Sequence, residues 1–264
     1  MLRWLLIGAA LAGGCGDDSA PRPPEPDAGP TGTPSIEGTP VSSFETTSCT
    51  TGTVIELSRQ IAEEVDCLMP GQLVKFELMA GMRISGSAVL PYLGSPARTD
   101  LYATANALPT TPMQINSALR TVVQQYLLRR WFELGRCGIT AAAEPGRSNH
   151  ESGRALDISN YSAWVTTFGN HGWSHDIPGD PVHFDHLASA DIRGAGVVAF
   201  QRLWNRNAPD DQIAEDGDFG PATAERVKRA PAEGFGIGAV CATRRRLEIM
   251  RPDTAVMPQP WQAD

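Results

Sequence analysis

Two histidines and an aspartate stand out in this sequence because their types and spacing could bind a metal ion. His150 and Asp157 lie in the run Ser-Asn-His-Glu-Ser-Gly-Arg-Ala-Leu-Asp of residues 148–157, and His183 follows in Asp-Pro-Val-His. Two imidazoles and one carboxylate leave the fourth position of a tetrahedral Zn²⁺ ion open, which is typical of a catalytic site. The sequence has no Cys-x-x-Cys pair for a structural zinc. The pattern therefore predicts a hydrolytic zinc centre.

Short strands are expected to carry two of these ligands. Asp157 stands between Leu156 and Ile158, so a strand over residues 155–158 would place its carboxylate opposite these apolar neighbours. His183 is flanked by apolar residues in the same way. The alternative is a pair of ordinary loop histidines beside surface acids.

These segments resemble the VanY-type zinc D-alanyl-D-alanine carboxypeptidases, within the LAS metallopeptidases. The runs Ser-x-His-x-x-Gly-x-Ala-x-Asp and acid-x-x-His are similar to theirs, and residues 115–121 resemble the family's Ser-x-x-Arg segment. The resemblance covers about residues 80–190. It implies that the two histidines and Asp157 hold Zn²⁺, that Asp180 is the general base and that Arg120 binds a substrate carboxylate. The substrate-binding residues implied with Arg120 are Ser117, Gln125 and Ser148.

Two segments depart from the family's pattern. The family's base is commonly glutamate, and Asp180 is one methylene shorter, so His175 and His186 remain alternative bases. The family often has Gly-Tyr before the arginine, where this chain has Ala118 and Leu119. That change is expected to alter how a peptide stem packs.

The chemistry can be argued from the residues themselves. Peptide hydrolysis at neutral pH needs a nucleophile stronger than free water, and zinc lowers the pKa of its bound water towards about 7. A carboxylate within reach, such as Asp180, can take the proton of that water and later give it to the leaving amine. A guanidinium such as Arg120 binds a free C-terminal carboxylate through charge-assisted hydrogen bonds. We therefore expect exopeptidase action. The alternative for Arg120 is a solvated residue at the start of a helix.

The first residues are typical of an exported bacterial protein. Residues 1–14 combine Arg3, an apolar run too short to span a bilayer as a helix, and small residues directly before Cys15. Cys15 resembles a lipobox cysteine, which implies lipidation and a place in the cell envelope, facing the periplasm or the exterior. Ala12 stands where that pattern prefers leucine, so simple secretion is the alternative. We expect residues 15–45, rich in Pro and Gly, to form a disordered linker.

Four further cysteines predict two disulfide bonds with three possible connectivities, because an even number in an exported chain is typical of paired cysteines. We expect Cys49 to pair with Cys67, since they flank one predicted helix, and Cys137 to pair with Cys241. Free buried thiols are the alternative.

Short strands mixed with helices indicate an α+β fold. Helical spacing of apolar residues and helix-end signals predict helices over residues 54–65, 99–108, 121–134 and 163–170. Strands are expected over residues 73–78, 113–116, 155–158 and 182–184. The family resemblance implies a Hedgehog-like fold in which a small antiparallel sheet with flanking helices carries the zinc site. We expect this catalytic domain to span residues 46–190.

Residues 191–264 have a pattern of their own. An amphipathic helix is expected over residues 197–204, followed by the turn Asp-Gly-Asp-Phe-Gly-Pro-Ala-Thr at residues 216–223 and a helix over residues 224–228. This small helical segment resembles the three-helix peptidoglycan-binding domains, which implies binding to the cell wall. A structural extension of the catalytic domain is the alternative.

The composition limits the partners. A net charge of −8, with a single run of three arginines at residues 244–246, disfavours nucleic acid. We expect a monomeric zinc enzyme that acts on peptidoglycan stem peptides and contacts the membrane only through a lipid anchor. Release of the terminal D-alanine from D-Ala-D-Ala ends is the first hypothesis. The alternatives are a D,D- or L,D-endopeptidase that cuts cross-links and a non-catalytic wall-binding lipoprotein that retains zinc.

Overall fold

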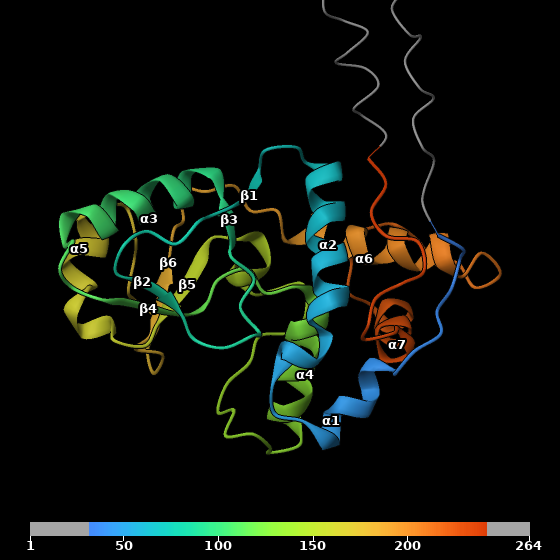
Figure 1. Ribbon diagram of the computed structural model, residues 1–264. Helices are drawn as coiled ribbons and strands as arrows, with labels where there is room; N and C mark the ends of the chain where they lie inside the picture. The colour runs from blue at the N-terminus through green and yellow to red at the C-terminus, as the bar shows by residue number, and fades with distance from the viewer. Residues whose placement is uncertain (1–31, 242–264) are drawn as a thin grey trace, which may run out of the picture.

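The computed structural model describes residues 32–241 of the 264-residue chain, and its fold is α+β, as the sequence predicts. The longer helices are α2 (Ile55–Leu68), α3 (Ser95–Ala107), α4 (Val122–Glu133), α6 (Arg193–Asn207) and α7 (Pro221–Arg229). Two short helices are α1 (Phe44–Thr47) and α5 (Val165–Asn170). The strands are β1 (Leu73–Lys75), β2 (Met82–Ile84), β3 (Tyr92–Gly94), β4 (Met113–Ser117), β5 (Ala155–Ile158) and β6 (His183–Asp185). The sheet with α3 and α5 lies on the left of Figure 1, and the other helices lie on the right.

The larger sheet has four strands in the order β2-β4-β5-β6. β4, β5 and β6 pair antiparallel, whereas β2 pairs parallel with β4, so the sheet is mixed and not wholly antiparallel as expected. The parallel pair arises because the chain crosses between these two strands through β3 and α3. β5 and β6 place Asp157 directly opposite His183.

Two hydrophobic clusters stabilise the fold. The first lies between the larger sheet and the helices α3 and α5, with Leu101, Ile115, Leu156, Phe168 and Phe184 fully buried. The second joins α2, α4, α6 and α7, with Leu57, Leu127, Phe200, Leu203 and Val227 fully buried. Because burial of each such side chain contributes about 1.5–3 kcal/mol, both clusters hold the sheet and the helical part in place.

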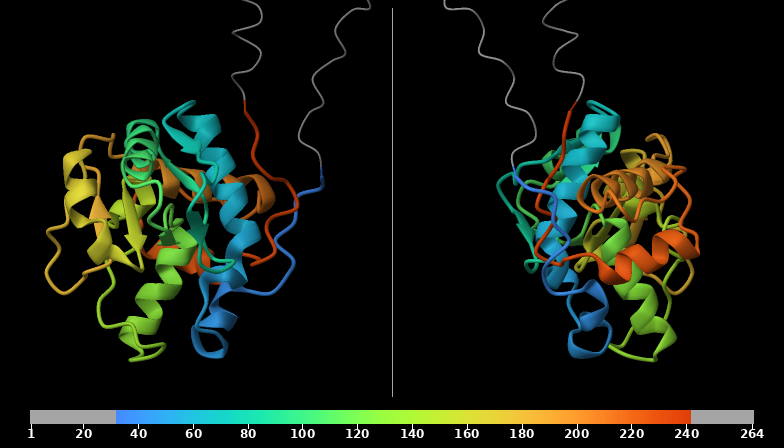
Figure 2. Two further views of the ribbon diagram at one scale, coloured as in Figure 1. Left: turned by 60° about the vertical axis from the view of Figure 1, so that its left-hand side comes forward. Right: turned by 90° about the vertical axis from the view of Figure 1, so that its right-hand side faces the viewer.

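The C-terminal segment shares its core with the preceding part of the chain. Figure 2 shows α6 beside α2 from two sides, and the second cluster contains apolar residues of both helices. α6 also packs against the turn that carries His150. Part of the expected linker packs here too, since Val41 donates its backbone N–H to Ala230 and Ala232 donates to Thr39. Residues 39–41 therefore lie along the end of the C-terminal segment and are not a free tether.

Residues 32–241 contain two disulfide bonds, as the cysteine count predicts, but the expected pairing is wrong. Cys49 pairs with Cys137, and Cys67 pairs with Cys241. Cys49 precedes α2, and Cys67 lies near the far end of the helix, about 18 Å along its axis from Ile55. A disulfide joins Cα atoms only about 4.4–6.8 Å apart. α1 instead packs against α4 and brings Cys49 to the chain that follows α4.

The predicted signal peptide of residues 1–14 and the lipidation site Cys15 lie outside the described residues. Among the helices of residues 32–241, none combines the length and apolar character needed to cross a bilayer.

Candidate metal centre

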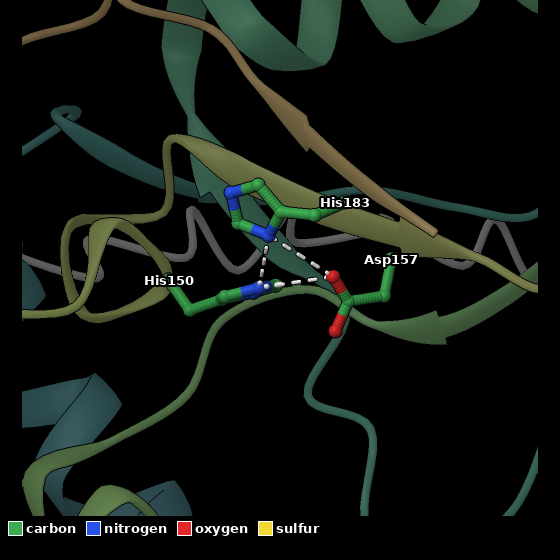
Figure 3. A group of neighbouring side chains, drawn as sticks. All are labelled: His150, Asp157 and His183. Atoms are coloured by element: carbon green, nitrogen blue, oxygen red, sulfur yellow. Dashed lines mark hydrogen bonds and ion pairs between the residues drawn. The ribbon is translucent and has the colours of Figure 1, made fainter. Parts of the chain in front are cut away.

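His150, Asp157 and His183 come together at one point of the molecule (Figure 3). His150 lies in the 3₁₀ turn Asn149–Ser152, and the other two residues face each other across β5 and β6. Nε2 of His150, Nδ1 of His183 and Oδ1 of Asp157 are each 3.2 Å from the other two atoms. Neighbouring ligand atoms of a tetrahedral zinc ion lie about 3.4 Å apart, given bonds of about 2.0–2.1 Å. The group can therefore hold a metal ion.

The outward-facing ring nitrogens show which atoms are free to bind a cation. Nδ1 of His150 lies 2.8 Å from the carbonyl oxygen of Ala118, and Nε2 of His183 lies 3.0 Å from Oδ1 of Asp185. Both partners only accept, so each of these nitrogens carries the proton. The inner nitrogens then present lone pairs to each other and to the Asp157 carboxylate. Three acceptors with one common centre fit a metal ion, and the partners of the outward nitrogens fix the rings as they do in known metal sites.

In the metal-free site, charge interactions favour a proton on the nitrogen of His183 that would bind the metal ion. Burial acts to lower the pKa of His183, but hydrogen bonds to Asp157 and Asp185 outweigh it and raise this pKa to about 9. Burial acts to raise the pKa of Asp157, yet the neighbouring His150 and His183 hold it well below its usual range. Burial lowers the pKa of His150. A metal ion would therefore displace one proton from His183.

Arg120 contacts the second oxygen of Asp157. Its Nη2 lies 3.4 Å from Oδ2 of Asp157 and donates to Oγ of Ser117 at 3.2 Å, and its Nη1 donates to Oε1 of Gln125 at 3.2 Å. Gln125 is itself fixed, because its amide donates to the carbonyl of Ala143 at 2.8 Å. Ser117 and Gln125 thus hold the guanidinium that the sequence predicts for carboxylate binding. Oγ of Ser117 also lies 3.4 Å from Nδ1 of His150.

A cleft of about 490 Å³ opens onto this group. The predicted site residues among those that line it are Arg120, Ser148, His150, Asp180 and His183. Asp157, on β5, completes the group but does not line the cleft. The structure therefore brings the two histidines, the predicted base and the predicted carboxylate-binding arginine to one cleft.

No protein-family model matches the chain, and no curated protein matches it. The likeness to the VanY-type peptidases therefore rests on the sequence motifs alone.

Asp180 is the one of the three candidate bases that lines the cleft. It lies in the turn before β6, and its carboxylate has no hydrogen-bond partner among residues 32–241. His186 is buried, and its two ring nitrogens bond to the side chains of Ser189 and Asp100. His175 bonds through Nε2 to a backbone carbonyl at 2.7 Å and stacks on a tyrosine ring. Both histidines are thus engaged elsewhere.

Two acids of the site were not predicted from the sequence. Asp185 follows His183 by two positions on one strand, which places both side chains on the same face, and this spacing was the available signal. It also accepts from Nδ2 of Asn149 at 2.9 Å. Glu151 is buried and accepts from the backbone N–H groups of Gly146 and Ser148, and burial raises its pKa to about 7. Glu151 and Ser148 form a capping box that fixes the turn carrying His150.

Proposed function

We propose that this protein is a zinc-dependent hydrolase of peptidoglycan stem peptides that releases the terminal D-alanine from D-Ala-D-Ala ends. One observation carries the proposal: Asp157 presents one oxygen to the two histidines and the other to Arg120. A cation for a free carboxylate therefore lies beside the metal group in the same cleft. This neighbourhood suits a scissile bond close to a chain end, as in a carboxypeptidase.

His150, Asp157 and His183 would hold the ion. Zinc bound there supplies Lewis-acid chemistry, since it lowers the pKa of a coordinated water and polarises a carbonyl. The donor set supports zinc as the ion, because two imidazoles and one carboxylate are a usual catalytic set for zinc.

Arg120 would bind the carboxylate of the terminal residue. A guanidinium has five N–H groups, and three hydrogen bonds from Arg120 to neighbouring side chains leave two for a substrate. The partners also restrict the side chain, so little rotamer entropy is lost when substrate binds.

Asp180 would act as the general base and then as the general acid. Its carboxylate would accept a proton from the attacking water and return that proton to the nitrogen of the leaving D-alanine. The half-buried position of Asp180 in the cleft, without a competing hydrogen bond among the described residues, favours this role. Two protein-derived groups, Asp180 and Arg120, would then flank the scissile bond.

We further propose that the mature chain is an exported monomer of the bacterial cell envelope, anchored through lipid on Cys15. Two disulfide bonds support an oxidising compartment outside the cytoplasm. The wall-binding role of residues 191–264 is part of the same proposal and rests on the motif resemblance alone.

The deciding experiment is mass spectrometry of purified stem peptides after incubation with the zinc-loaded protein, with and without a chelator. We expect chelator-sensitive loss of one alanine from pentapeptides. Separation of cross-linked dimers would instead establish an endopeptidase. No change in any peptide, with zinc confirmed in the protein, would favour a non-catalytic wall-binding protein.

The variant Asp180→Ala tests the assigned base. We expect it to retain zinc and to lose turnover. Unchanged turnover would remove Asp180 from the reaction, and loss of zinc would make it a support of the metal site.

A further inference from the structure

A second hollow adjoins the cleft of the metal centre. It has a volume of about 610 Å³ and lies between the loop of residues 144–147 and the turn of residues 217–220. Arg147 and Arg193 line both the hollow and the cleft. The two spaces therefore adjoin at these two arginines, and together they are called the groove.

The loop of residues 144–147, on one side of the hollow, is held in place by a buried acid. The Glu151 carboxylate accepts from the backbone N–H of Gly146 at 2.8 Å and from that of Ser148 at 3.0 Å. Arg147 stands between these two anchored residues. Gly146 has a positive φ of 81°, and a Cβ there would lie 3.5 Å from Phe219. The loop thus packs directly against the turn.

The turn on the other side is held by a buried glutamine of α6. Gln201 donates from Nε2 to Oδ1 of Asp216 at 2.8 Å and to Oγ1 of Thr223 at 3.1 Å, and its Oε1 accepts from the backbone N–H of Gly217 at 3.0 Å. A Cβ at Gly217, where φ is +75°, would lie 3.2 Å from the carbonyl oxygen of Gly194. The turn residues that resemble a peptidoglycan-binding domain therefore form this side of the hollow.

The charges that line the hollow are only partly neutralised within the protein. Arg193 pairs with Asp191, and Glu144 pairs with Arg129 at 2.6 Å. The remaining two charged side chains, Arg147 and Asp218, are exposed. Among the described residues they form no ion pair, either with each other or with another side chain. Arg147 lies where the hollow meets the metal cleft, whereas Asp218 lines the hollow alone. One cation and one anion thus face the same space without a partner.

We propose that this hollow binds a side chain of the peptide substrate that ends in both a carboxylate and an ammonium group. Arg147 would bind the carboxylate and Asp218 the ammonium. A diamino-dicarboxylic acid residue carries both groups on its terminal side-chain carbon, whereas lysine ends in an amine alone. The proposal rests on the proposed function for its substrate class, and it makes Arg147 and Asp218 determinants of specificity.

The test uses the zinc-loaded protein and four peptides that end in D-Ala-D-Ala. The preceding residue is a diamino-dicarboxylic acid, its side-chain amide, its N-acetylated form, or lysine. We expect the loss of either side-chain charge to raise KM about fivefold above that of the unmodified peptide. The effect is modest because exposed ion pairs are weak. The turnover number should change little, because the groups lie away from the scissile bond.

Two variants separate the charges. Arg147→Gln should abolish the preference for carboxylate over amide and keep the preference for free over acetylated amine, and Asp218→Asn should do the reverse. Arg83→Gln and Asp210→Asn change exposed charges outside the groove and are the matched controls. Equal KM values for all four peptides, or equal effects of the control variants, would overturn the proposal.

A neutral acyl-D-Ala-D-Ala dipeptide distinguishes failure of this proposal from failure of the proposed function. If the dipeptide is hydrolysed and KM does not depend on side-chain charge, the hollow has no such role and the function stands. If nothing is hydrolysed, calorimetric titration of the four peptides decides. Charge-dependent affinity that Arg147→Gln removes would support the hollow, and equal affinities or no binding would overturn it.

Discussion

Asp185 accepts a hydrogen bond of 3.0 Å from Nε2 of His183 and thereby fixes which nitrogen of that ring faces Asp157. Asp185 is 5% exposed and is also held by Asn149, so it cannot turn towards solvent without losing two partners. The carboxylate both orients the imidazole and makes it a stronger electron donor, as in other metal sites with this arrangement. The geometry of the three-residue group therefore depends on a fourth residue.

Replacement of Asp185 by asparagine should weaken metal binding while the fold is kept. We expect the zinc dissociation constant to rise 10- to 100-fold, which is typical when such a partner loses its charge. Competition with a chromophoric chelator measures it, and Asp180→Asn is the control because that residue is not a proposed ligand. Equal zinc affinity in Asp185→Asn and the unchanged protein would show that the carboxylate does not support the site.

Zinc affinity should also depend on pH in a defined direction. In the metal-free protein, burial disfavours the charged His183 ring, but Asp157 and Asp185 raise its pKa to about 9. Below pH 9 zinc must displace this proton, so the apparent affinity should fall roughly tenfold for each pH unit of acidification. Above pH 9 the dependence on this proton should end. Calorimetry at pH 7.5 in buffers of different ionisation enthalpy should show release of about one proton, and release of none would contradict the assignment.

Much of the fold could be predicted from the sequence where the pattern is long or strict. The expected helix over residues 121–134 and strand over residues 155–158 coincide with α4 and β5 to within a residue. β2 and β3 were not predicted, because each has only three residues and neither carries the longer apolar-polar run that marks β1 or the ligand histidine that marks β6. α3 begins at Ser95, earlier than residue 99, because Pro96 is tolerated in the first turn.

The three-residue group was predictable because each ligand carries a local signal in the sequence. The disulfide pairing was not, since Cys137 meets Cys49 only through the packing of α1 on α4. The second hollow was also beyond the sequence. It depends on the approach of Gly146 to Phe219, two residues that are far apart in the chain and are joined by tertiary packing.

Arg120 should determine the preference for a free C-terminal carboxylate. We expect Arg120→Gln to lower kcat/KM for a peptide acid about 10- to 100-fold, since a hydrogen bond to a charged group contributes roughly 1.5–3 kcal/mol. The variant should hydrolyse the peptide acid and its C-terminal amide equally well, whereas the unchanged protein should prefer the acid. Because Arg120 also contacts Asp157, zinc content must be measured alongside. A variant that keeps zinc and still prefers the acid would remove Arg120 from substrate binding.

Stability of the helical part should depend on one buried ion pair between α2 and α6. Glu64 is 1% exposed, and its two oxygens accept from Arg206 at 3.1 Å each, while Oε2 also accepts from the backbone N–H of Val240. Replacement of Glu64 by alanine leaves the guanidinium without its partner, and the loss of a buried partner costs about 3–5 kcal/mol. Arg206 is 21% exposed, so we expect the free energy of unfolding to fall by about 3 kcal/mol, at the lower end of that range.

Glu63→Ala, at the exposed neighbouring position, is the matched control and should lower the free energy of unfolding far less. Urea unfolding of the disulfide-intact protein gives both values, and a similar loss in the two variants would show that the Glu64–Arg206 pair does not join the C-terminal segment to α2.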